Sequence, residues 1–117
     1  MEDKMNKTLK RKWIKALRSG RYRKGLNTLK TGQGHNTRYC CLGVLAQISG
    51  VKWKEEFSGF LLPFKDGKCV GMAGRRAEFL DPEFFGIPMK VQRRLAEQND
   101  SGLPFEDVAA TIEKWKD

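Results

Sequence analysis

An almost unbroken apolar run, Cys41–Ile48, constrains the fold of this chain more than any other feature, and it ends at Ser49 and Gly50. A chain of 117 residues has room for one modest core. We therefore predict a single domain, residues 1–117, with this run inside its core. A short buried helix is the favoured structure for the run. A buried strand is the alternative, because an apolar run without alternation fits both.

The segment from Lys4 to Arg18 is predicted to be a helix. At 100° per residue its apolar side chains share one face; they are Met5, Leu9, Trp13, Ala16 and Leu17. Ser19 and Gly20 supply the stop, because a glycine can adopt the left-handed conformation that ends many helices.

Turn residues and periodicity divide the rest of the chain into short elements. Strands are predicted at 26–31, 60–64 and 69–72, and residues 38–42 suit either a strand or the start of the buried helix. Asp66-Gly67 joins the two later strands, since this dipeptide accepts positive φ, and Pro63 is expected on an edge strand or at a strand end. Helical segments are predicted at 81–85, 88–99 and 104–116. The fold class is α+β: three or four short helices packed on a small antiparallel sheet.

Positive charge is concentrated at the start of the chain. The first 50 residues contain 12 Lys and Arg against two acids, a charge of +10, and residues 51–117 contain 11 against 12, a charge of −1. The two parts sum to the +9 of the whole chain. This separation predicts a cationic surface at one end of the molecule and an anionic partner for it.

Seven cations and no acid lie between Lys4 and Arg18. On the polar face they repeat at i+3 and i+4, where like charges destabilise an isolated helix by roughly 0.2–0.5 kcal/mol per pair. A solvated face that aids solubility is one interpretation, and an anion-binding face is the one we favour. Residues 1–25 are thus predicted to form a basic amphipathic helix and turn. The predicted anion-binding residues are Lys4, Lys7, Arg11, Lys15, Arg18, Arg21, Tyr22, Arg23, Lys24 and Arg38.

The predicted partner is nucleic acid or a nucleic-acid-bound host protein. Cations along one helix face can follow a phosphate backbone, and Tyr22, between Arg21 and Arg23, can stack on a base. The sequence has no zinc-finger spacing and no helix-turn-helix signature, so we expect weak sequence preference and steep salt dependence. A small phosphorylated ligand or an acidic protein patch is the alternative partner. The glycine-rich bend at 71–76 suits either an anion-binding nest or a flexible connection.

The cysteine and histidine residues of the chain give little support for a catalytic site or a metal site. The cysteines, Cys40, Cys41 and Cys69, are odd in number and are expected to be reduced thiols. A position near a helix start lowers a thiol pKa, and His35 is the one histidine that could act as a base, but apolar neighbours favour a core role. The spacing does not suit zinc. We predict no catalytic residue, no metal, no cofactor and no enzymatic activity; a small enzyme acting at Cys40 or Cys41 is the third hypothesis.

Three stretches of the chain resemble a group of small, uncharacterised phage and prophage accessory proteins. They are Trp13–Gly20 followed by Tyr22 and Gly25, the motif Tyr39-Cys40-Cys41-Leu42-Gly43-Val44-Leu45, and residues 95–102 followed by Phe105 and Ile112-Glu113. The resemblance implies a protein of the bacterial host cytoplasm that binds and blocks a host component, such as a defence nuclease or a nucleotide signal. The basic first helix departs from the group, as does Lys24, where Gln is more usual. The cationic face is therefore expected to be a property of this member.

Two functional hypotheses of different classes follow. The leading one is a non-enzymatic, phage-type accessory protein with a counter-defence role that binds a polyanion through its basic N-terminal helix. The second is a sponge for a phosphorylated, cyclic-nucleotide signal of host defence. It requires a concave pocket at a subunit interface, lined by a few of these cations and an aromatic. No apolar run approaches the ~20 residues of a membrane span, and no signal-peptide pattern is present, so we expect a cytoplasmic protein without a membrane partner.

Overall fold

The helix α2 (Cys41–Ile48) lies at the centre of the fold, which a computed structural model describes for residues 5–55, 60–71 and 78–116. Its first six residues, Cys41–Ala46, are all buried. A helix that is apolar on all sides needs neighbours on all sides. The run therefore forms the favoured buried helix and not a buried strand.

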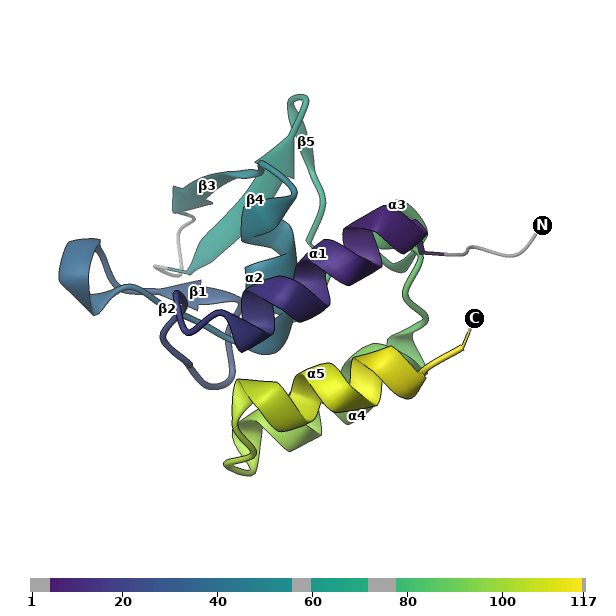
Figure 1. Ribbon diagram of the computed structural model, residues 1–117. Helices are drawn as coiled ribbons and strands as arrows, with labels where there is room; N and C mark the ends of the chain where they lie inside the picture. Colours follow the sequence, from purple (N-terminus) through teal and green to yellow (C-terminus); the bar gives the residue numbers. More distant parts are fainter. Residues whose placement is uncertain (1–4, 56–59, 72–77, 117) are drawn as a thin grey trace.

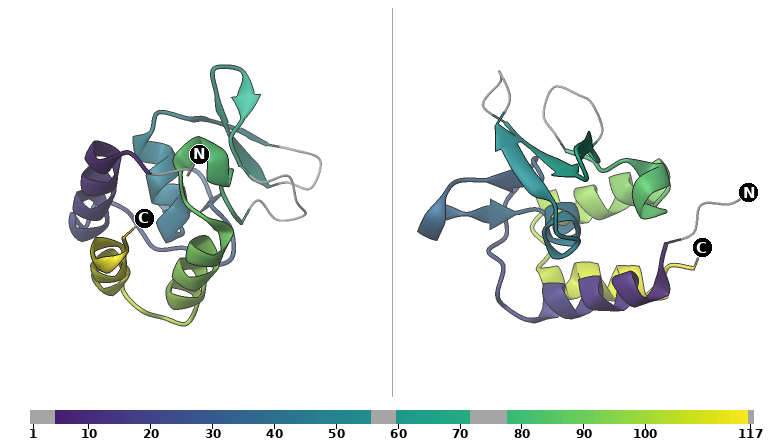
Figure 2. Two further views of the ribbon diagram at one scale, coloured as in Figure 1. Left: turned by 90° about the vertical axis from the view of Figure 1, so that its right-hand side faces the viewer. Right: turned by 90° about the horizontal axis from the view of Figure 1, so that it is seen from above.

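Two longer helices, α1 (Lys7–Arg18) and α4 (Met89–Asp100), pack against α2, and α5 (Phe105–Lys114) packs against both of them (Figures 1 and 2). Helices α1 and α5 lie side by side and antiparallel, so the start of α1 is close to the end of α5. Helix α1 begins later than predicted because the Asn6 side chain caps it, accepting a hydrogen bond of 2.9 Å from the Leu9 amide.

Two small antiparallel sheets complete the fold. Strands β1 (Lys30–Thr31) and β2 (Arg38–Tyr39) form one sheet, with a 3-10 turn at Gly34–Asn36 between them. The other sheet has the order β3-β4-β5, made by β3 (Lys52–Glu55), β4 (Leu61–Lys65) and β5 (Lys68–Cys69). The short helix α3 (Pro82–Phe85) follows. The α+β class is confirmed, with five α-helices, α3 included, and two sheets in the described ranges.

The predicted hairpin turn is confirmed, whereas two strand predictions were wrong. Asp66 and Gly67 both have positive φ, 53° and 79°. Pro63, however, lies in the central strand β4. Proline has no N–H to donate to the Val70 carbonyl, which lies opposite it on the β5 side. That carbonyl accepts a hydrogen bond from the Asp81 amide, so it is not left unpaired. The strand predicted at 26–31 is reduced to β1, because Asn27 has a φ of 67°.

The three stretches that resemble phage proteins meet at the start of α2. The Trp13 indole donates to the Cys41 carbonyl at 2.8 Å. The Asn99 side chain accepts from the Cys41 amide at 3.1 Å and donates to the Gly25 carbonyl at 2.9 Å. All four residues are buried. All three stretches thus contribute to one buried junction, and they also include exposed residues such as Lys15. Within the described ranges, none of the helices is long and apolar enough to cross a bilayer.

Candidate anion-binding surfaces

The outward face of α1 carries three of the predicted cations. Lys7, Arg11 and Lys15 are four residues apart and exposed, so they follow one another along one side of the helix. None of the three has an ion-pair partner among the described residues. Trp13 and Leu17 bury the opposite side of the helix in the core. The prediction of one cationic side and one core side is therefore correct for this segment, and Lys4 lies outside the described residues.

Two other cations of α1 are used in packing against α5. Arg18 forms a salt bridge of 3.1 Å with Glu113, and this guanidinium holds the pKa of the Glu113 carboxyl below its usual value. The Lys10 ammonium donates to the Trp115 carbonyl at 2.5 Å and lies 4.9 Å from the centre of the Trp115 ring. A cation is favourable there because the end of a helix carries partial negative charge. Arg18 therefore has a carboxylate of its own and contributes less to an anion site than predicted.

The remaining predicted residues form a second cluster beyond the end of α1. Arg38 donates to the Lys24 carbonyl at 3.3 Å, and Arg23 donates to the His35 carbonyl at 3.1 Å. Lys24 is half-buried and donates to the Leu103 carbonyl at 2.5 Å. Arg21 is exposed. We call Arg21, Arg23, Lys24 and Arg38 the loop cluster. None of the four has a carboxylate partner among the described residues.

Tyr22 packs into the edge of the core. Its ring meets the Tyr39 ring edge-on, with centroids 5.5 Å apart and an interplanar angle of 82°. The side chain is half-buried. Only the exposed part of the Tyr22 ring can therefore stack on a base, as was predicted for this residue.

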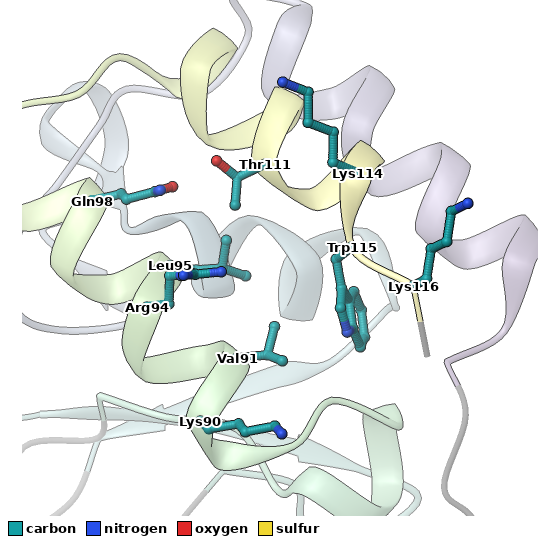
Figure 3. A pocket seen from close by; sticks show the side chains of 9 residues that line it. All are labelled: Lys90, Val91, Arg94, Leu95, Gln98, Thr111, Lys114, Trp115 and Lys116. Carbon is teal, nitrogen blue, oxygen red and sulfur yellow. The ribbon is translucent and has the colours of Figure 1, made fainter.

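A groove between α4 and α5 was not predicted from the sequence. Its volume is about 780 Å³, and the cations that line it are Lys90, Arg94, Lys114 and Lys116. In Figure 3, Lys90 and Arg94 extend from α4 and the Trp115 ring lies between the helices. Lys114 and Lys116 belong to the opposite rim, and their side chains run from it away from α4. No Asp or Glu is among the described residues that line this groove. We call it the α4–α5 groove.

One local signal for the groove was present in the sequence. Lys90 and Arg94 are four residues apart, so they share a face of α4. Lys114 and Lys116 lie at the end of the last helix, where their positive charge suits the helix dipole. Nothing in the sequence brings the two pairs together, because that depends on how α4 packs against α5.

Cys40 and Cys41 are buried, which decides their chemistry. Cys40 caps α2, and the Gly43 amide donates to its sulfur at 3.4 Å. Desolvation outweighs this hydrogen bond and raises the pKa of the Cys40 thiol to about 12. Burial likewise raises the pKa of Cys41 well above its ordinary value. The position of Cys40 at a helix start therefore does not lower its pKa, and neither thiol is a thiolate nucleophile at neutral pH. No metal-ligating cluster of three or more side chains occurs in the described part of the chain.

We expect native-state thiol labelling to distinguish the three cysteines. At about pH 8, an aromatic disulfide reagent should modify at most the half-buried Cys69 in the folded protein and all three thiols after unfolding. A Cys69→Ser variant should then show no rapid native-state reaction. Rapid modification of two or more thiols in the folded protein would contradict the burial described here.

Comparison with known proteins identifies a family without assigning an activity. Residues 5–65 match the family described as a domain of unknown function, DUF8296. No curated protein matches the chain, and no solved structure matches it. The matched residues cover slightly more than half of the 117 residues and run from the cap of α1 to the end of β4. The chain therefore belongs to the DUF8296 family.

Proposed function

We propose that this protein is a non-enzymatic, phage-type accessory protein that binds a polyanion through the outward face of α1. The polyanion is nucleic acid or a nucleic-acid-bound host complex. The observation that carries the proposal is the row of exposed cations Lys7, Arg11 and Lys15, which have no carboxylate partner among the described residues. Such a row raises the potential along one side of the helix and attracts a chain of phosphates.

The geometry of α1 suits a linear anion. Residues four apart are separated by about 6 Å along a helix, so the three charges are spread over about 12 Å. The core contacts of Trp13 and Leu17 hold the helix in one orientation, so the row of charges does not need to be ordered on binding. Little conformational entropy is then lost when phosphates displace the counterions.

The loop cluster extends the proposed contact surface. Arg21, Arg23 and Arg38 are exposed beyond the end of α1. Two of the hydrogen bonds in this cluster lead from guanidinium groups to backbone carbonyls. The guanidinium groups are therefore positioned without being neutralised, and they retain donors for phosphate oxygens.

Neutralising the α1 row should weaken binding and reduce its salt dependence. We expect the triple variant Lys7→Gln, Arg11→Gln, Lys15→Gln to bind a fluorescent single-stranded or duplex oligonucleotide at least about tenfold more weakly at low salt. The slope of log K against log salt should become shallower by about two to three. Fluorescence anisotropy at salt concentrations from about 50 to 200 mM measures both quantities.

A matched control removes the same charge from another face. Lys52, Lys54 and Lys68 are exposed on the β3-β4-β5 sheet, and their replacement by Gln also lowers the net charge by three. The control should retain most of the wild-type affinity and slope. The proposal fails if the wild-type protein does not bind at low salt, if its binding is indifferent to salt, or if the control is as damaging as the α1 variant.

The phage setting and the counter-defence role are proposed from the resemblance of three segments of the sequence. A tagged copy captured from infected host cells, with and without nuclease treatment, tests them. If nucleic acid joins this protein to its host partners, nuclease treatment should release the captured host proteins. Capture of a host protein that survives nuclease and persists in the α1 triple variant would contradict the proposed contact.

A further inference from the structure

The α4–α5 groove has the composition of a phosphate site. Lys90 and Arg94 from α4 and Lys114 and Lys116 from the end of the chain line one concave surface. None of the four has an ion-pair partner among the described residues. A concave surface with cations and an apolar floor concentrates field lines, so an anion is attracted more strongly there than to the same charges on a flat face.

The groove also offers an aromatic and apolar wall. The Trp115 ring is half-buried and lines the groove together with Val91 and the fully buried Leu95. Lys10 holds Trp115 from the α1 side through its carbonyl and its ring. The ring is therefore fixed in place and available as a surface for a planar group. Cations beside a fixed indole are typical of sites that bind a phosphate together with a base.

A third feature is an unpaired acceptor. Gln98 lines the groove, and its side-chain oxygen is buried without a hydrogen-bond partner. In Figure 3, Gln98 lies beside Thr111, at the end of the groove away from Lys90. A buried acceptor without a donor destabilises the free protein. A ligand hydroxyl or N–H group that reached this oxygen would remove that cost.

We propose that the α4–α5 groove binds a nucleoside phosphate, either as a free nucleotide or as the phosphorylated end of a single strand. Arg94 and Lys90 bind the phosphate oxygens, for which a guanidinium offers two parallel donors. The base packs against Trp115 and Val91. This site is separate from the α1 row and does not depend on the function proposed above. It also differs from the sponge hypothesis, which placed the pocket among the N-terminal cations.

Two neighbouring arginines provide a sharp test. Arg94 lines the groove, whereas Arg93 is exposed on the same helix and does not line it. Calorimetry at low salt should show saturable binding of ATP or AMP to the wild-type protein. Arg94→Gln should weaken this binding at least about tenfold, because it removes a charged hydrogen-bonding pair. Arg93→Gln and the α1 triple variant should change it less than about threefold, a limit that allows for long-range charge effects.

The tryptophan indole N–H signals report where the ligand binds. Trp13 and Trp53 donate to internal acceptors, the Cys41 carbonyl and the Gln47 side chain. Addition of ATP should therefore shift the Trp115 signal in a proton–nitrogen correlation spectrum and leave the other two nearly unchanged. A shift confined to Trp13 or Trp53 would overturn the proposal, and so would the absence of a Trp115 shift with both millimolar ATP and a 5′-phosphorylated oligonucleotide.

Two further ligands separate the parts of the proposal. Inorganic pyrophosphate should bind at least about tenfold more weakly than ATP, since it lacks a base to pack against Trp115. Equal binding of the two would overturn the nucleoside part. A 5′-phosphorylated oligonucleotide that shifts Trp115 where free nucleotides do not would identify a strand end as the source. If neither ligand responds to Arg94→Gln, the site is not where we place it.

Discussion

Gly43→Ala should leave little folded protein. A Cβ atom at this position would lie 1.7 Å from the Leu29 carbonyl oxygen and 2.7 Å from its carbon. These are backbone atoms, and the same carbonyl accepts from the Cys40 amide at 3.2 Å, so they cannot move without breaking the contact at the start of α2. We expect a loss of more than roughly 4 kcal/mol in the free energy of unfolding, a value that marks severe core damage.

The sign of this effect makes it a sharp test. Inside a helix, alanine is normally more stable than glycine by about 1 kcal/mol, so α2 considered alone predicts a gain. Gly67→Ala is the control: this glycine has a φ of +79° and no heavy atom within 4 Å of its Cβ position. It should lose only about 1–2 kcal/mol. Urea unfolding followed by circular dichroism measures both variants, and a Gly43→Ala protein as stable as wild type would contradict the packing described here.

Asn99→Ala is expected to cause the second large loss of stability. The substitution leaves the buried Cys41 amide and the buried Gly25 carbonyl without their partners. A buried polar group left unpaired costs about 1–3 kcal/mol, so we expect the free energy of unfolding to fall by about 2–5 kcal/mol. The urea midpoint should fall accordingly, and backbone amide exchange should increase first at the start of α2.

The neighbouring Asp100 provides the matched control. It is exposed, and its carboxylate accepts from the Asn27 amide at 3.1 Å and from the Asn99 side chain at 3.0 Å. Asp100→Asn keeps a side-chain oxygen for these donors, so its stability should remain within about 0.5 kcal/mol of wild type. Equal losses for the two variants would mean that Asn99 does not join the three segments.

The stability variants and the binding variants concern different parts of the molecule. Gly43 and Asn99 are buried at the start of α2, whereas the α1 row and the cations of the α4–α5 groove lie on the surface. Replacing Lys7, Arg11, Lys15 or Arg94 by Gln should therefore leave the unfolding midpoint nearly unchanged. A change in binding by these variants can then be interpreted as a change in the surface.

The helices could be predicted because their signals are local. Each signal lies within a single segment of the chain. The signals are the apolar stripe of α1, Pro88 at the start of α4 and the acidic first turn of α5. The hairpin turn at Asp66-Gly67 could also be predicted, because it depends on the conformation of only these two residues. Pro63 was misplaced because its tolerance in a central strand depends on Asp81, a distant residue that takes the neighbouring carbonyl.

The candidate sites divide in the same way. Periodicity placed Lys7, Arg11 and Lys15 on one side of a helix, because a helix keeps residues four apart on one face. It did not reveal that Lys10 and Arg18 are occupied by α5, since their partners, Trp115 and Glu113, are about a hundred residues away in the chain.

The order of residues along the chain by itself determined the helical faces, the buried run and the excess of positive charge at the start, because neighbours within a few residues settle each of these. Tertiary packing alone decided which cations remain free, how deeply Cys40 is buried, and that α4 and α5 enclose a cationic groove around Trp115. The physical reason is that desolvation and charge pairing depend on distance in space, and the groups that determine them come from segments that no local pattern of the sequence connects.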